Sequence, residues 1–118
     1  MIKGIDNFFL SAANLKETKA FYENILGLST KFNFEERGVI GFKLGNDEPA
    51  LILKDQHKFP DAKPTIWFVV EDVQKSYEDL LQKGVKFLSP PFQINVGMAV
   101  EFEDPAGNRL GLTSYNKS

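Results

Sequence analysis

The sequence contains no cysteine, which excludes disulfides, thiolate nucleophiles and sulfur-ligated zinc or iron–sulfur sites. It has a single histidine, His57, which falls in a predicted linker and is expected to have no role. No apolar run approaches the ~20 residues that a membrane helix needs, and the longest, 66–70, is the size of a strand. The N-terminal segment also lacks the apolar core of a signal peptide. These absences predict a cytoplasmic protein that does not contact a membrane.

An excess of charge of either sign is also missing. The 14 Lys and Arg residues nearly balance the 16 Asp and Glu residues, and the net charge is −2. Two arginines, Arg37 and Arg109, and twelve scattered lysines form no basic stripe. Because binding along a phosphate backbone needs clustered cations, the sequence argues against a nucleic-acid partner.

The residues that are present suit one compact α+β domain. The chain has 118 residues, 42% hydrophobic and 13% aromatic, which is enough for a core but too short for two domains. A strand at 8–12 precedes a helix that Asn14 caps and that Gly27 ends. Three further strands are predicted at 28–34, 39–44 and 50–54.

The same pattern then repeats. A strand at 66–70 precedes a helix that begins after Asp72 and ends at Gly84. Strands follow at 85–88, 98–102 and 110–114, and a tight turn joins the last two. The two caps are 58 positions apart and the two stop glycines are 57 positions apart, which indicates an internal duplication.

The repeat predicts two βαβββ modules, at about 1–55 and 64–118, with a linker at 56–63. Together they should form an eight-stranded, partly open mixed barrel with helices on one side of the sheet and a ligand-binding cleft on the other. Alternation along the strands assigns residues to the helix side, namely Phe8, Leu10, Ala12, Leu51, Leu53, Ile66, Phe68, Val70, Val100, Phe102, Leu110 and Leu112. The residues expected to line the cleft are Asn7, Phe9, Ile52, Thr65, Trp67, Glu101 and Gly111. Phe32 and Phe34 share a face that the pattern does not identify.

Each of these inward residues has a functional and a structural interpretation. Phe9 and Trp67 could clamp a flat ligand by stacking, or simply fill the space. Glu101 is the only inward carboxylate and therefore the only catalytic candidate, although a solvated position at the rim would explain it equally. Asn7 and Thr65 could bind a ligand or each other. Gly111 could widen the cleft or permit close packing of a neighbouring side chain.

Three segments carry a resemblance to a known family. The runs NLKETKAFYENILGL, FVVEDVQKSYEDLLQKGV and FEDPAGNRLGL resemble the glyoxalase, bleomycin-resistance and extradiol-dioxygenase superfamily, also called vicinal oxygen chelate. The resemblance implies paired βαβββ modules around a cleft. It also implies a divalent metal held by His and Glu of the first and last strands, at positions that correspond here to Asn7, Ile52, Thr65 and Gly111. Since none of these is an imidazole or a carboxylate, we expect no metal and no cofactor.

The resulting functional hypothesis is a metal-free binding protein similar to the bleomycin-resistance type, which sequesters a drug. The family also implies a homodimer, because its clefts are commonly completed across a two-fold interface. Two alternatives remain open. One is a metal-dependent lyase, isomerase or dioxygenase with ligands at other positions, and the other is a regulatory or partner-binding module whose cleft is filled by its own side chains.

Overall fold

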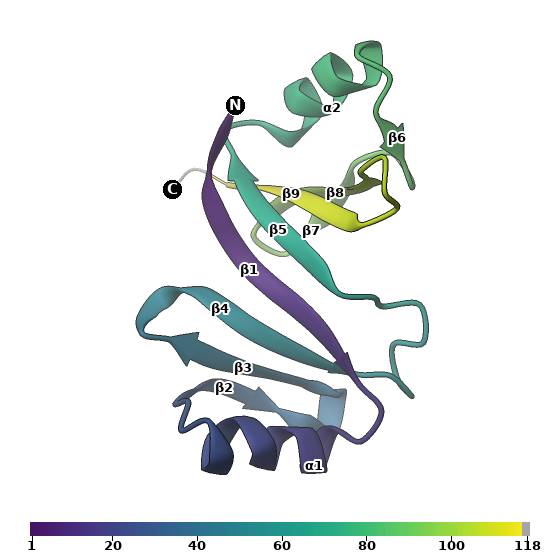
Figure 1. The fold of residues 1–118 in the computed structure, drawn as a ribbon. Helices are drawn as coiled ribbons and strands as arrows, with labels where there is room; N and C mark the ends of the chain where they lie inside the picture. The colour runs from purple at the N-terminus through teal and green to yellow at the C-terminus, as the bar shows by residue number, and fades with distance from the viewer. Residues whose placement is uncertain (117–118) are drawn as a thin grey trace. The chain divides into compact units, whose positions relative to one another are not determined.

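The computed structural model describes residues 1–116, except for the side chain of Asp47. Two compact units make up the chain: unit 2 is Asn7–Pro64, and unit 1 combines Met1–Asp6 with the chain from Thr65 onward. Strand β1 (Ile2–Ala12) therefore contributes to both units (Figure 1). In hydrogen-bonded order, unit 2 contains β2-β3-β4-β1 and unit 1 contains β1-β5-β9-β8-β6, with β7 beside β8. The fold is mixed α+β, and the path of paired strands ends at β2 and β6 without closing.

In unit 2, a helix follows β1 directly because Asn14 caps it, accepting a hydrogen bond from the Glu17 amide at 3.0 Å. The remaining elements are α1 (Leu15–Ala20), the π-helical turn η1 (Phe21–Ile25), β2 (Thr30–Phe34), the 3-10 turn η2 (Glu35–Arg37), β3 (Val39–Leu44) and β4 (Asn46–Asp55). Strand β1 is parallel to β4, and the other pairs are antiparallel. Side chains from α1 and from one sheet face form the core, including Ala12, Leu15, Ile40, Phe42, Leu51 and Leu53.

Unit 1 repeats this plan with Asp72 as the helix cap, whose side chain accepts from the Lys75 amide. Its elements are β5 (Thr65–Val70), α2 (Val73–Gln82), β6 (Lys86–Phe87), β7 (Phe92–Ile94), β8 (Gly97–Glu103) and β9 (Arg109–Tyr115). Figure 1 shows α2 on one side of the strands of this unit. Its core contains Val70, Val73, Val100 and Leu112, with Phe68 and Phe102 packed against them. In both units the alternation assigned the helix side correctly for these positions. We call the opposite surface of each sheet the helix-free face.

Three details differ from the sequence prediction. The described chain has nine strands rather than eight, because Phe92–Ile94 resumes pairing with β8 after the proline pair at 90–91 interrupts it. Strand β1 begins at Ile2 instead of Phe8. Ile66 is 37% exposed, since it and its partner Leu110 lie at the beginnings of β5 and β9, outside the cluster that α2 covers.

The one-residue difference between the two repeat intervals has a structural cause in the first helix. Thirteen positions separate Asn14 from Gly27, but only twelve separate Asp72 from Gly84. The extra residue is accommodated in η1, where the amide of Leu26 bonds to the carbonyl of Phe21, five residues earlier. Both stop glycines keep a positive φ, 72° and 87°, so each helix still ends in the left-handed conformation.

Candidate functional site

On the helix-free face of unit 1, strand register brings the four predicted residues of this unit together. Trp67 pairs with Gly111, and Gly111 pairs with Glu101, so the three form one row across β5, β9 and β8. Thr65 starts the adjacent row, where it pairs with Arg109. Thr65 and Trp67 are both buried, at 6% and 8% exposure.

Gly111 does not open a space in this row, because the indole of Trp67 covers it. A Cβ built on Gly111 would lie 2.3 Å from Cε3 of Trp67, well inside van der Waals contact. Of the two interpretations of Gly111, close packing of a neighbour is the one observed. The indole forms an apolar floor on this part of the face, and only 8% of Trp67 is exposed.

Glu101 has a cationic neighbour that the sequence analysis overlooked. Arg109 Nη1 lies 3.7 Å from Glu101 Oε2, and the two side chains are 24% and 28% exposed. Alternation along the strand could have predicted this neighbour, since Arg109 is two residues before Gly111 and therefore on the same face of β9. The pair places one carboxylate and one guanidinium beside the indole floor.

On the helix-free face of unit 2, one row crosses four strands. Phe9 pairs with Ile52, Ile52 with Gly41, and Gly41 with Phe32. The ring of Phe32 covers Gly41, where an added Cβ would lie 2.3 Å from Cε2. Phe32 is thereby assigned to the helix-free face, and its ring centroid lies 5.5 Å from that of Phe34. The row is apolar from end to end.

The polar groups around this row are already engaged. Asn7 Oδ1 accepts a hydrogen bond from the Ala50 amide at 3.3 Å. The Lys54 ammonium lies 4.6 Å from the ring centroid of Phe9 and 5.1 Å from that of Phe59. A cation therefore sits over the Phe9 ring that was predicted to stack on a ligand.

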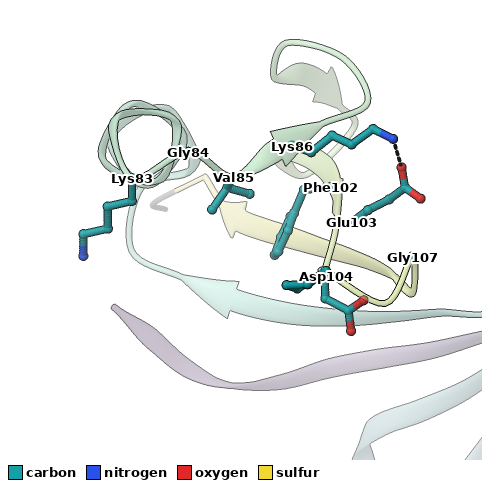
Figure 2. Close-up of a pocket in the computed structure, with 9 residues that line it drawn as sticks. Lys83, Gly84, Val85, Lys86, Phe102, Glu103, Asp104 and Gly107 are labelled. Atoms are coloured by element: carbon teal, nitrogen blue, oxygen red, sulfur yellow. Dashed lines mark ion pairs between the residues drawn. The ribbon is translucent and has the colours of Figure 1, made fainter.

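Two cavities lie away from these rows and contain none of the predicted residues. The larger, about 560 Å³, is in unit 1, between the end of α2 and the turn that joins β8 to β9 (Figure 2). The smaller, about 390 Å³, is at the start of α1, and His57 contributes to its wall beside Asn14 and Glu35. His57 was predicted to have no role, and neither cavity was predicted from the sequence.

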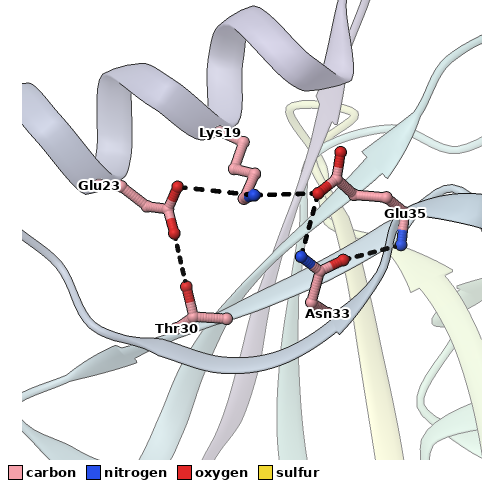
Figure 3. A network of polar contacts seen from close by, with 5 residues as sticks. All are labelled: Lys19, Glu23, Thr30, Asn33 and Glu35. Carbon is pink, nitrogen blue, oxygen red and sulfur yellow. Dashed lines mark hydrogen bonds and ion pairs between the residues drawn. The ribbon is translucent and has the colours of Figure 1, made fainter.

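A polar network on unit 2 ties the helical segment to β2 (Figure 3). Lys19 Nζ lies 2.9 Å from Glu35 Oε1 and 3.7 Å from Glu23 Oε1, while the Thr30 hydroxyl donates to Glu23 at 2.8 Å. The hydrogen bond between Lys19 and Glu35 raises the pKa of Lys19 and lowers that of Glu35. Asn33 Nδ2 also donates to Glu35 at 3.0 Å. Each charged group in the network thus has hydrogen-bond or ionic partners within it, which indicates a structural clamp.

The positions that would hold a metal in this type of fold do not fit one. Ile52 and Gly111 offer no donor atom, and the space beside Gly111 is taken by the Trp67 ring. The Asn7 amide oxygen is engaged by the Ala50 amide. Thr65 offers only a buried hydroxyl. Within the described residues, no group of three His, Cys, Asp or Glu side chains is arranged to hold an ion.

The fold and this arrangement of strands place the chain in a defined class. The model of the glyoxalase/bleomycin resistance protein/dioxygenase superfamily matches residues 4–112, so the chain belongs to that superfamily. The three sequence runs had indicated a resemblance to this superfamily and to its paired βαβββ modules.

Individual proteins resemble this chain over only part of its length or at low sequence identity. The uncharacterized protein YurT of Bacillus subtilis (strain 168) is 33% identical over 67 residues, which are 57% of this chain and 53% of YurT. The match therefore spans about half the length of that curated relative. A superfamily member from Vibrio splendidus 12B01 has a similar structure, with a TM-score of 0.70 at 13% identity, covering 97% of this chain and 99% of the other.

Methylmalonyl-CoA epimerases are also among the similar structures. The Streptomyces coelicolor enzyme, solved in complex with 2-nitronate-propionyl-CoA, has a TM-score of 0.71 at 20% identity, covering 99% of this chain and all of the other. The Mycobacterium tuberculosis enzyme has a TM-score of 0.71 at 15% identity, covering 98% and 90%. At these identities the likeness concerns the fold alone. Among the described residues, neither α-helix is long and apolar enough to cross a membrane.

Proposed function

We propose that this protein binds a small, partly aromatic organic molecule on its helix-free faces without a metal ion. On unit 2 the binding residues are Asn7, Phe9 and Ile52, and on unit 1 they are Thr65, Trp67, Glu101 and Gly111. Gly111 takes part indirectly, by letting the indole lie flat on the sheet. Drug sequestration of the bleomycin-resistance type is the specific activity proposed, and it needs no covalent step.

The observation that carries this proposal is the Trp67–Gly111 contact. It fills with an aromatic ring the place at which the family resemblance implies a metal-binding side chain. An apolar, ring-lined surface with few polar groups is typical of small-molecule sites. The Glu101–Arg109 pair adds an accepting carboxylate and a donating guanidinium that can orient a ligand.

The decisive test uses the only tryptophan of the chain as a reporter. Glycopeptide and aromatic drugs, together with 2-oxoaldehyde–thiol adducts, would be titrated while Trp67 emission and the melting temperature are recorded. The proposal predicts a saturable change in emission and a rise in melting temperature with at least one aromatic drug, unaffected by EDTA. Glu101→Gln should weaken that binding, whereas Glu78→Gln, at an exposed position on α2, should not.

Metal titration separates this proposal from the enzymatic alternative. Mn²⁺, Fe²⁺, Ni²⁺ and Zn²⁺ should leave the melting temperature unchanged. A stabilising shift that EDTA reverses, together with turnover that EDTA abolishes, would show that the proposal is wrong.

The proposal includes a cytoplasmic homodimer. Light scattering of the purified protein should give twice the mass of the 13.3 kDa chain, and a monomeric mass would remove this part of the proposal.

A further inference from the structure

The larger cavity of unit 1 lies on the opposite side of the sheet from Trp67. Its volume is about 560 Å³, and its walls come from the end of α2, from β6, from the end of β8 and from the following turn. Phe102, which lines it, packs against the core cluster beneath α2 and is therefore on the helix side. The cavity is thus separate from the helix-free face and has a volume in the usual range for ligand sites.

The middle of the cavity is apolar. Val85 and Phe102 line it there, and Glu103, Asp104 and Gly107 lie at one end (Figure 2). Lys83 lies at the other end, and its side chain extends away from Val85. A ligand that lies along the cavity would therefore meet carbon surface along its length and charged groups at both ends.

Three of the four charged side chains around the cavity already have hydrogen-bond or ionic partners. Lys86 Nζ lies 3.1 Å from Glu103 Oε1, so these two charges neutralise each other. The Asp104 carboxylate accepts hydrogen bonds from the amides of Ala106 and Asn108 and from the Asn108 side chain, at 2.8–2.9 Å. Both carboxylates are therefore already bound to other groups of the protein, and Asp104 keeps its negative charge.

Lys83 is the remaining charge. Within residues 1–116 its ammonium has no hydrogen-bond or ion-pair partner, and its position is the C-cap of α2. An anion bound here would gain an ionic contact without breaking an existing one. The cavity therefore has an apolar body, with one available positive charge beside it.

The comparison with the first copy of the repeat shows how the cavity arises. Lys83 occupies the place immediately before the stop glycine that Leu26 holds in unit 2. The strands β8 and β9 are joined by five residues, 104–108, whereas only Gly45 separates β3 from β4. The longer turn supplies one wall of the cavity, and the lysine supplies its charge.

We propose that this cavity is a second binding site, specific for a small apolar monoanion such as an aliphatic or aromatic carboxylate. The carboxylate of the ligand would pair with the Lys83 ammonium, and its hydrocarbon part would lie on Val85 and Phe102. This site is independent of the function proposed for the helix-free faces.

Octanoate, octanol and octylamine form a matched set of probes that differ only in the head group. Each would be titrated into ¹⁵N-labelled protein, and the amide shifts of Gly84 and Gly107 would be followed by NMR while Trp67 emission is recorded. The proposal predicts that octanoate binds at least about fivefold more tightly than octanol, that octylamine binds most weakly, and that Trp67 emission does not change.

Substitution of the lysine tests the charge directly. Lys83→Gln should weaken octanoate binding about fivefold without changing octanol binding, and Lys83→Glu should reverse the preference to octylamine. Lys75→Gln, at an exposed position on α2 outside the cavity, is the matched control and should bind octanoate as the unsubstituted protein does. An unchanged ¹H–¹⁵N spectrum outside the cavity would show that each variant is folded.

Several results would overturn the proposal. Equal binding of octanoate and octanol, no shift at Gly84 and Gly107 at millimolar octanoate, or equal weakening by the Lys83 and Lys75 substitutions would each do so. A change in Trp67 emission with octanoate would place the binding on the helix-free face instead. Drug binding is followed by Trp67 emission, and octanoate binding by the amide shifts of Gly84 and Gly107. Failure of either proposal would therefore not prevent a test of the other.

Discussion

The indole of Trp67 lies so close to Gly111 that a β-carbon at position 111 would be 2.3 Å from the ring. The indole is also 8% exposed, so it has little room to move away. Gly111→Ala should therefore lower the free energy of unfolding by about 1–3 kcal/mol through overpacking. Urea denaturation monitored by Trp67 emission would measure the loss.

Gly4→Ala is the matched control for that substitution. Gly4 is also in a strand, but nothing lies within 4 Å of the position that its Cβ would take. The control should change stability by less than about 0.5 kcal/mol. Equal effects of the two substitutions would mean that the ring does not constrain position 111.

Ser114 connects β9 to the beginning of α2. Its hydroxyl oxygen accepts a hydrogen bond at 3.1 Å from the amide of Val73, which is fully buried and is the first residue of the helix. Ser114→Ala should leave this amide without an acceptor and cost about 1–3 kcal/mol in thermal or urea denaturation. Ser89→Ala, at an exposed loop position, should be nearly neutral. A neutral Ser114→Ala would show that water or another group satisfies the amide.

The Lys19–Glu35 ion pair should make the stability of the chain depend on pH at both extremes. The lowered pKa of Glu35 means that its contribution is present above the ordinary glutamate value and is lost as the pH falls through the lowered one. The raised pKa of Lys19 means that its contribution is present below the ordinary lysine value and is lost as the pH rises through the raised one.

Lys19→Met tests this pair. The variant should be less stable than the unsubstituted protein near neutral pH, and the difference should shrink in acid and in high salt. Lys75→Met, on the exposed surface of α2, should show no such dependence. The measurement is the melting temperature as a function of pH. A difference that stays constant down to strongly acidic pH would contradict the assignment.

Asp104 organises the turn between β8 and β9. The hydrogen bond from the Asn108 side chain, aided by backbone amides, lowers the pKa of its carboxyl group. The stabilisation is therefore present above the ordinary aspartate value and disappears as the pH falls through the lowered one. Asp104→Asn should destabilise the protein at pH 7 but not in strong acid, whereas Asp79→Asn, on the exposed side of α2, should change little at either pH. Urea denaturation at the two pH values would test this, and an acid-independent effect would count against it.

The repeat, the helix caps and the helix stops could be predicted because they depend on local backbone requirements. Asn14 and Asp72 accept amide hydrogen bonds three residues ahead, and Gly27 and Gly84 adopt positive φ, whatever surrounds them. Alternation also separated core residues from those on the helix-free face. What it could not supply was register, so the Trp67–Gly111 contact, the Glu101–Arg109 pair and the position of Phe32 emerged only from the structure.

The cavity of unit 1 was missed for a related reason. The segment between the last two strands was interpreted only as a tight turn, and Gly84 only as the end of a helix. Neither local feature indicates that a longer turn and a helix terminus enclose a space. The functional roles of the seven predicted site residues remain predictions that the binding experiments address.

Because Ile2–Asp6 belongs to one unit and the rest of β1 to the other, the boundary in sequence does not coincide with the boundary in space. A fragment ending at Pro64 would retain Asp6 but lose Tyr115, whose hydroxyl donates to that buried carboxylate at 2.5 Å. A fragment starting at Thr65 would lack the strand that completes its sheet. Each fragment would therefore lose a hydrogen-bond partner or a strand that the rest of the chain supplies.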